Sequence, residues 1–175
     1  FGIILEQLQK IANEEKYSLI LTGAYRRDIE SLDITPFIKH SIEGLIIVGS
    51  DRGQKTWYEP LKKRKIPTAQ IGVSQDRVGA QVCVDEKKAA ALVVRHIKKC
   101  QYKSVALFFG QSFSHELYHE ACCGELHKKK VDIMHDITCD SSNVMEAIDK
   151  IIAAELLPDV IICGDDLIAM TVISS

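Results

Sequence analysis

Two adjacent carboxylates, Asp165 and Asp166, follow the apolar run Pro158–Cys163 and a glycine. An apolar run closed in this way is typical of a buried strand that leads into a helix. In an open sheet of parallel strands, ligands bind beyond the carboxyl ends of the strands, at the N-termini of helices. Carboxylates at such a place suit a polyhydroxylated ligand. The alternative is that both carboxylates only cap the helix.

Hydroxyls, carboxylates and glycines recur at the other expected strand ends. These ends are residues 23–27, 49–53, 72–75, 85, 110–114 and 139–142. Gly72, Val73, Asp85 and Ser114 lie there, and we predict that they line a ligand site together with the carboxylate pair. Loops that begin helices favour the same residue types for capping alone, so capping is again the alternative.

His115 and His119 are spaced i, i+4 on an expected helix, and Cys122 follows three residues later. Such spacing places nitrogen and sulfur ligands for a metal ion on one helical face. The sequence shows no second cluster that completes the site. We therefore predict that these residues lie on the helix surface, and we expect neither a metal ion nor another cofactor.

Signatures of common enzyme sites are missing from the sequence. It has no glycine-rich dinucleotide loop, Walker loop, G-x-S-x-G elbow or H-E-x-x-H zinc motif. Ser114 beside His115 is too common a pair to indicate a nucleophile and its base. The sequence thus predicts a protein without catalytic activity. A doubly wound enzyme is the alternative, and it would need a phosphate-binding glycine loop.

The composition is that of an ordinary globular domain: 175 residues, 46% hydrophobic and 26% charged. No apolar run reaches the length of about 18 residues that a membrane span requires, and the start does not resemble a signal peptide. A net charge of −2 argues against a dedicated nucleic-acid surface. The six cysteines lack C-x-x-C spacing, and Cys83, Cys139 and Cys163 lie in or beside apolar runs. These features predict reduced thiols in the cytoplasm.

Strand-like and helix-like segments alternate along the chain. Residues 82–110 are predicted to form a strand, a helix capped by Asp85 and a second strand, with the two strands paired in parallel. The second of these strands, 105–109, is an uninterrupted apolar run, which is typical of a strand buried on both faces. Ala90, Ala91, Val94 and Ile97 are expected to face inward on the helix, as are Ile148, Ile151 and Ile152 on a later one.

Further strands are expected at 17–22, 42–48, 66–72, 131–137 and 158–163. Helices are expected at 1–15, 28–40, around 57–61, from near 114, at 143–156 and after 165. This alternation predicts an α/β fold of parallel sheets with helices on both faces.

Three blocks near the middle of the chain follow one another in a distinctive order: Asp85, then His96-Ile97, then Val105-Ala106. Upstream of them lie Ile42-Glu43-Gly44-Leu45-Ile46 and Ile66-Pro67. In order and spacing these blocks resemble the effector-binding domain of LacI/GalR-type bacterial repressors. The family's corresponding blocks read V-x-x-D-N, H-L and G-H-x-x-I-A, preceded by V-D-G-I-I and I-P-V-V.

The resemblance implies an α/β fold of the periplasmic-binding-protein-like type I class. Two doubly wound parallel-sheet subdomains enclose a ligand cleft in that class. Residues 1–84 would form the N-terminal subdomain and residues 85–175 the C-terminal one. It also implies a first strand ahead of residue 1 and further residues after Ser175.

The resemblance assigns a role to the carboxylate pair, which falls on the family's N-D in P-x-A-I-x-x-x-N-D-x-x-A-x-G. Asp166 would accept hydrogen bonds from the hydroxyls or amines of the ligand. Asp165 replaces the family's Asn and adds a charge, and Thr171 stands where the family usually has Gly.

Tyr118 falls on the ligand-binding arginine of the family's R-x-x-G-F block, with Ala121 and Cys122 in place of Gly and Phe. Either Tyr118 supplies stacking and one hydroxyl, or Arg77 or Lys103 takes part instead. The loss of the arginine's bidentate fork weighs against a ligand with a carboxylate or a phosphate.

By resemblance, the chain is the ligand-sensing domain of a LacI-type transcriptional regulator. A sugar or sugar derivative would close the cleft and control operator binding by a homodimer. Operator DNA would be bound by a helix-turn-helix headpiece absent from this sequence, and helices 1–15 and 87–99 are candidates for the dimer contact. The alternative is a periplasmic sugar-binding protein of a transport system, against which the six unpaired cysteines count.

Overall fold

The structure is a computed structural model that describes residues 2–21, 42–49, 55–73, 75, 79–139 and 143–174, with only the backbone for residues 55–57. The chain divides into two compact units, residues 1–36 and 37–175. The predicted helix at 28–40 lies outside the described residues, as do the predicted turn residues 50–53 and 140–142.

Helix α1 (Gly2–Glu14) is the regular element among the described residues of the first unit. Of its apolar stripe, Ala12 is buried, whereas Ile11 is 54% exposed. Residues 17–21 form no strand, so the prediction of a strand there is wrong for these residues, and Thr22 lies outside the described part. An apolar run becomes a strand only when a neighbouring backbone pairs with it, and no described strand pairs with this one.

The first sheet of the second unit has the strand order β1-β2-β3. Its elements are β1 (Leu45–Val48), α3 (Lys55–Lys63), β2 (Thr68–Ile71) and β3 (Ala80–Val82). Both pairings are parallel, with Ile46 opposite Ala69 and Ile71 opposite Val82. On α3, which forms where the sequence predicts a helix around 57–61, Tyr58 and Leu61 are buried.

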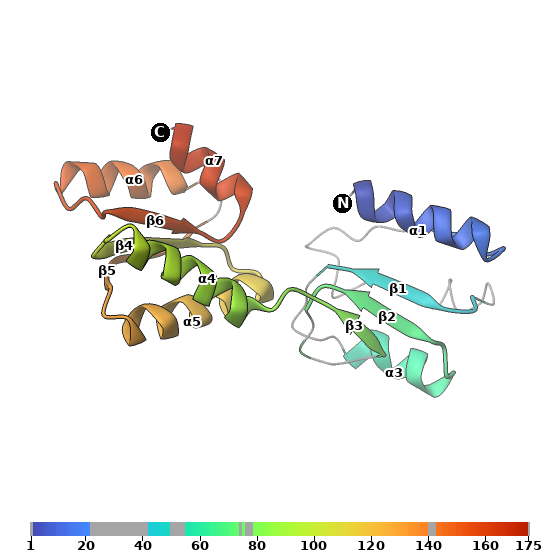
Figure 1. Ribbon diagram of the computed structural model, residues 1–175. Helices are drawn as coiled ribbons and strands as arrows, with labels where there is room; N and C mark the ends of the chain where they lie inside the picture. Colours follow the sequence, from blue (N-terminus) through green and yellow to red (C-terminus); the bar gives the residue numbers. More distant parts are fainter. Residues whose placement is uncertain are drawn as a thin grey trace. The chain divides into compact units, whose positions relative to one another are not determined.

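The second sheet has the order β5-β4-β6 and is also parallel. Its strands are β4 (Ser104–Phe109), β5 (Asp132–Thr138) and β6 (Val160–Cys163). The helices between and after them are α4 (Glu86–Lys99), α5 (Phe113–Lys128), α6 (Val144–Ala153) and α7 (Asp166–Ser174). Figure 1 shows α4 and α5 on one face of this sheet and α6 and α7 on the other.

Strand β4 is the core of the second sheet, because its successive side chains point to opposite faces. Val105, Leu107 and Phe109 pack with α4 and α5, whereas Ala106 and Phe108 pack with α6 and α7. The prediction of a strand buried on both faces is confirmed, and so is the α/β fold with parallel sheets and helices.

Four details of the sequence prediction are wrong. Strands β3 and β4 belong to different sheets, because β5 and β6 occupy both edges of β4 and leave none for β3. Ala91 is exposed although Ala90, Val94 and Ile97 are buried. Ile152 is 55% exposed next to buried Ile151. Cys83 is exposed, as are Ala80 and Val82 in β3 just before it.

Asp159 ties the start of β6 to the start of β4. Its Oδ2 accepts hydrogen bonds from the backbone N–H groups of Lys103 (2.7 Å) and Ser104 (3.0 Å). The Asp159 N–H in turn donates to Ser104 Oγ at 3.0 Å. The two backbone donors stabilise the carboxylate and hold the pKa of Asp159 below its ordinary value.

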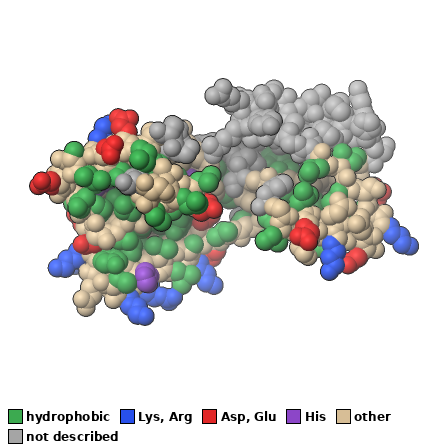
Figure 2. All heavy atoms as spheres, turned by 90° about the horizontal axis from the view of Figure 1, so that it is seen from above, with side chains coloured by type: hydrophobic (Ala, Val, Ile, Leu, Met, Phe, Trp, Pro, Cys, Tyr) green, Lys and Arg blue, Asp and Glu red, His purple; other side chains and the backbone are tan. Residues whose placement is uncertain are grey.

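All six cysteines are free thiols. None of the helices in the described ranges is long and apolar enough to cross a membrane. Hydrophobic side chains nevertheless reach the surface of the molecule (Figure 2). On α7, Leu167, Met170 and Ile173 are 65%, 64% and 84% exposed.

Candidate functional site

The carboxyl ends of β4 and β6 meet at His115, which α5 contributes. The backbone N–H of Gly110 donates to His115 Nδ1 at 2.9 Å, and His115 Nε2 lies 3.5 Å from Asp165 Oδ2. Because Nδ1 accepts a hydrogen bond, the neutral ring carries its proton on Nε2, which faces the carboxylate. We call Gly110, Ser114, His115, Gly164 and Asp165 the strand-end cluster.

Two glycines make room for the imidazole of His115. A Cβ atom on Gly110 would lie 2.6 Å from His115 Nδ1, and one on Gly164 would lie 3.0 Å from Phe109 Cδ1 and 3.2 Å from His115 Nδ1. Any larger residue at Gly110 would displace the ring from its hydrogen bond. The glycine at each strand end therefore positions the histidine.

The start of α5 places His115 over these strand ends. Ser112 is the N-cap, and its Oγ accepts a hydrogen bond from the His115 N–H at 3.3 Å. Ser112 Oγ also lies 3.2 Å from Ser114 Oγ, so the predicted site residue Ser114 belongs to this hydrogen-bonded turn. The serine cap thus brings a hydroxyl and an imidazole to the end of β4.

The two carboxylates of the predicted pair differ in their contacts. Asp165 caps α7, because its Oδ1 accepts a hydrogen bond from the Ile168 N–H at 2.8 Å and its carbonyl accepts one from Ala169. Asp166 is the first residue of α7 and is exposed, and its carboxylate forms no hydrogen bond with the described residues. Asp165 is thus the N-cap of α7, whereas Asp166 lies one residue later, in the first turn of the helix.

Asp85 and Val73 line one hollow of about 430 Å³ with residues of α5. Its lining is Val73, Val84, Asp85, Glu86, Lys87, Leu117, Glu120 and Ala121. Asp85 also caps α4, since its Oδ1 accepts a hydrogen bond from the Lys88 N–H at 3.0 Å. Gly72 ends β2 at φ +127°, and its N–H donates to the Val82 carbonyl at 2.8 Å. At φ +127° a side chain would be strained, which accounts for the glycine.

Tyr118 turns toward the core of the second sheet. Its ring meets Phe109 edge-on, with ring centroids 5.5 Å apart, and its hydroxyl interacts with the thiol of Cys122. Burial raises the pKa of Tyr118 to about 12 and the pKa of buried Cys122 to about 12 as well. The hydroxyl of Tyr118 is therefore neutral and already has a partner.

The prediction that His115 and His119 are surface residues holds only in part, because their side chains are half-buried, at 15% and 28% exposure. The face of α5 that carries both histidines packs against β4. The ring centroid of Phe109 lies 6.3 Å from that of His115 and 5.2 Å from that of His119. The sequence feature that could have indicated this burial is Gly110, which ends the apolar run before the helix. The thiol near His119 belongs to Cys123 rather than Cys122.

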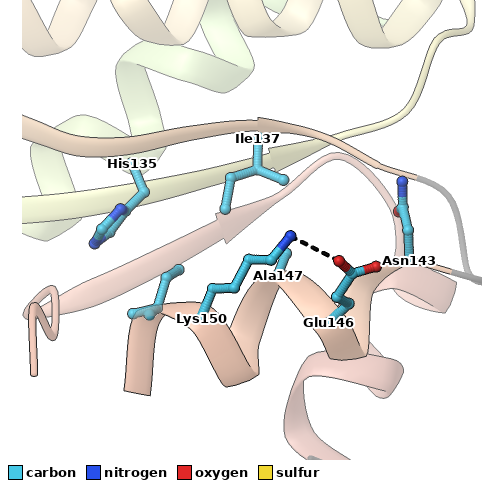
Figure 3. Close-up of a pocket in the computed structure, with 7 residues that line it drawn as sticks. His135, Ile137, Asn143, Glu146, Ala147 and Lys150 are labelled. Atoms are coloured by element: carbon cyan, nitrogen blue, oxygen red, sulfur yellow. Dashed lines mark hydrogen bonds and ion pairs between the residues drawn. The ribbon is translucent and has the colours of Figure 1, made fainter. Parts of the chain in front are cut away.

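A second hollow, of about 360 Å³, lies beside β5 and α6 (Figure 3). Its lining is His135, Ile137, Asn143, Glu146, Ala147, Lys150 and Ile151. Lys150 reaches Glu146 at 2.6 Å, and His135 Nε2 lies 2.8 Å from the Leu156 carbonyl oxygen. None of the predicted site residues lies here, and these polar groups already have partners. The strand-end cluster with Asp166 is the stronger candidate.

Comparison with known proteins identifies the fold. No protein-family model matches the sequence, and no curated protein matches it. The structure is similar to that of the Lac repressor dimer bound to operator and the anti-inducer ONPF, with a TM-score of 0.81 and 14% identity over 98% of this chain and 62% of that chain.

Two further regulators are similar. The protein named transcriptional regulator LacI from Bacillus cereus subsp. cytotoxis NVH 391-98 has a TM-score of 0.80 and 20% identity over 99% of this chain and 64% of its own. A PurR family transcriptional regulator from Vibrio parahaemolyticus RIMD 2210633 has a TM-score of 0.77 and 18% identity over 95% and 66%. This chain thus spans less than two thirds of each of these proteins. It has the periplasmic-binding-protein-like α/β fold of LacI-type effector-binding domains.

Proposed function

We propose that this chain is the ligand-sensing domain of a LacI-type transcriptional regulator, in which a small effector binds at the carboxyl ends of the strands. Residues 1–84 and 85–175 are its two subdomains in this proposal. The observation that carries it is the contrast at the start of α7, where Asp165 is engaged in capping and exposed Asp166 keeps its carboxylate available. This carboxylate stands where an effector would meet the end of β6.

The effector in this proposal is a neutral polyol, such as a sugar or sugar derivative. Asp166 accepts hydrogen bonds from its hydroxyls, and Asp165 adds negative charge beside it. Tyr118 supplies an aromatic edge, because its ring packs against Phe109 and the core of the second sheet. No arginine among the described residues of this cluster offers the bidentate fork that anionic ligands favour. Ser114, Gly72, Val73 and Asp85 complete the proposed set.

The experiment is a calorimetric screen of neutral and phosphorylated sugars against the complete protein. We expect Asp166→Asn to weaken binding of a neutral sugar by about 1.5–3 kcal/mol, which is roughly tenfold or more in Kd. Asp132→Asn is the matched control, since Asp132 is an exposed carboxylate at the opposite end of the sheet, in β5. It should leave the affinity unchanged.

Two results would contradict the proposed site. If phosphorylated sugars bind more tightly than neutral ones, the two carboxylates do not face the ligand. If Asp166→Asn binds like the unchanged protein, Asp166 only complements the positive end of α7.

The partners in this proposal are operator DNA, bound through a headpiece outside the given sequence, and a second copy of the chain. The setting is the cytoplasm, and the domain has no catalytic activity. A sugar-binding protein of a transport system is the second candidate, and it shares the fold. The regulators with similar structures and the six free thiols favour the sensor. Sugar-dependent binding of the complete protein to DNA separates the two candidates.

A further inference from the structure

Three metal-binding side chains converge between α5 and β5, away from the strand-end cluster. His119 and Cys123 lie one turn apart on α5, and Asp136 lies on β5. His119 Nε2 is 2.8 Å from Asp136 Oδ1 and 3.6 Å from Cys123 Sγ. All three potential ligand atoms lie within 4.8 Å of one another. The group joins two elements that are consecutive in the chain, so folding of this sheet assembles it.

The spacing is close to that of a tetrahedral zinc site. With bond lengths of about 2.3 Å to sulfur, 2.0–2.1 Å to nitrogen and 2.0–2.2 Å to oxygen, a tetrahedron separates S from N by about 3.6 Å and N from O by about 3.4 Å. The observed S–N distance of 3.6 Å already fits. The N–O distance must open from 2.8 Å. The side chain of Asp136 is 50% exposed, so it can turn to allow this.

We propose that His119, Cys123 and Asp136 bind one divalent transition-metal ion of the Zn²⁺ type, with the fourth position open to water. An imidazole, a thiolate and a carboxylate together suit Zn²⁺ or Co²⁺ better than the hard ions Mg²⁺ and Ca²⁺, which prefer oxygen ligands. Such an ion would link α5 to β5 directly. It would do so next to Phe109, whose ring contacts both His119 and His115.

Binding rearranges two protons. In the neutral ring, Nε2–H donates to Asp136 Oδ1; when the ion binds, Nε2 offers its lone pair and the ring proton is carried on Nδ1. The Cys123 thiol releases its proton to solvent and binds as the thiolate.

The chain contains a matched control for this group. His96 and Cys100 have the same i, i+4 spacing on α4 and its C-cap, with Cys100 Sγ 3.5 Å from His96 Nε2. Both are exposed, and no third His, Cys, Asp or Glu from the described ranges joins them. Two ligands hold a divalent ion more weakly than three. This pair therefore shows how strongly a helical His–Cys pair binds a metal ion without a third ligand.

The experiment is a titration of the complete, reduced protein with Co²⁺, followed by absorption spectroscopy. A tetrahedral Co²⁺ ion with one thiolate ligand gives intense visible bands and a sulfur-to-cobalt charge-transfer band. We expect one equivalent to bind with both features. Cys123→Ser should remove the charge-transfer band, and Asp136→Asn should weaken binding at least roughly tenfold. Cys100→Ser should leave the spectrum and the affinity unchanged.

The second readout is the Tm of the complete protein, measured with and without Zn²⁺. Zn²⁺ should raise the Tm, because an ion that binds only the folded state stabilises it, and Asp136→Asn should reduce this rise. Because Asp136 is half exposed, we expect Asp136→Asn to fold normally. This variant therefore tests the proposed metal site even if Cys123→Ser perturbs folding. Absence of the charge-transfer band in excess Co²⁺ would overturn the proposal. So would a band that survives in Cys123→Ser and disappears in Cys100→Ser.

Discussion

The central strands of the two sheets, β2 and β4, are both paired in parallel on both sides, yet they differ in burial. From Val105 to Phe109, β4 is apolar and buried without interruption. In β2 the buried residue is the polar Gln70, at 2% exposure, and its neighbours in the strand are half-buried. Strand pairing therefore does not decide burial; the helices that cover each face do.

The polar residue in β2 is satisfied locally. Gln70 Nε2 donates to the carbonyl of Gly49, just past the end of β1, at 3.1 Å. A buried amide is tolerated where it finds such a partner. From Val105 to Phe109, each side chain of β4 belongs to an apolar cluster with the helices on one face or the other. The free energy of burial should therefore be concentrated in the second sheet.

The largest expected effect is in β4. Leu107→Ala should lower the free energy of unfolding by about 2–5 kcal/mol, because it opens a cavity in a fully buried face. Ile46→Ala in β1 is the control, since Ile46 is 44% exposed, and it should cost about 1 kcal/mol or less. Denaturant unfolding of the two variants measures both values. Equal losses would break the comparison between the sheets.

A smaller effect is expected in β2. Gln70→Leu keeps the site filled but removes the hydrogen bond to Gly49, so it should cost about 0.5–1.5 kcal/mol. The cost stays modest because Gly49 is exposed and water can replace the lost donor. The same unfolding measurement checks it. A loss as large as that of Leu107→Ala would mean that the first sheet depends on this amide as much as the second depends on its apolar core.

The smallest effect depends on pH and concerns the edge at which β4 and β6 begin. The pKa of Asp159 is lowered by the Lys103 and Ser104 N–H donors, so the folded state holds the carboxylate ionised. A carboxyl group whose pKa is lower when folded stabilises the fold above its unfolded pKa of about 4. That stabilisation is lost as the pH falls through the lowered pKa.

Asp159→Asn should therefore be less stable than the unchanged protein at neutral pH, and the difference should shrink in acid. Unfolding curves at several pH values below and above about 4 test this. Asp132→Asn is the control, because Asp132 starts the other outer strand of the same sheet. A difference that stays constant with pH would show that the Asp159 charge plays no part.

Much of the fold could be predicted because it depends on local pattern. The run from Val105 to Phe109 predicted a doubly buried strand, and Asp85 predicted the cap of α4, which its bond to the Lys88 N–H confirms. That β3 pairs with β2 and not with β4 could not be predicted, because strand pairing depends on competition between strands far apart in the sequence. Ile152 likewise has the right spacing to be buried but lies beyond the area that the sheet covers.

The candidate site was predicted in part. The pair of carboxylates was identified because it follows an apolar run. That Asp165 caps α7 and Asp166 does not follows from the geometry of the first turn of the helix. His115 was assigned to the surface, because nothing in a helical repeat shows that Gly110 and Gly164 leave space for its ring.

The sequence by itself determined that His96 and Cys100, like His119 and Cys123, face the same side of a helix one turn apart. The tertiary structure decided their difference. Helix α5 rests on a sheet in which β5 presents Asp136 to His119, whereas α4 holds its pair out toward solvent. Helical periodicity fixes neighbours along one helix, but a third ligand from another element is supplied only by packing.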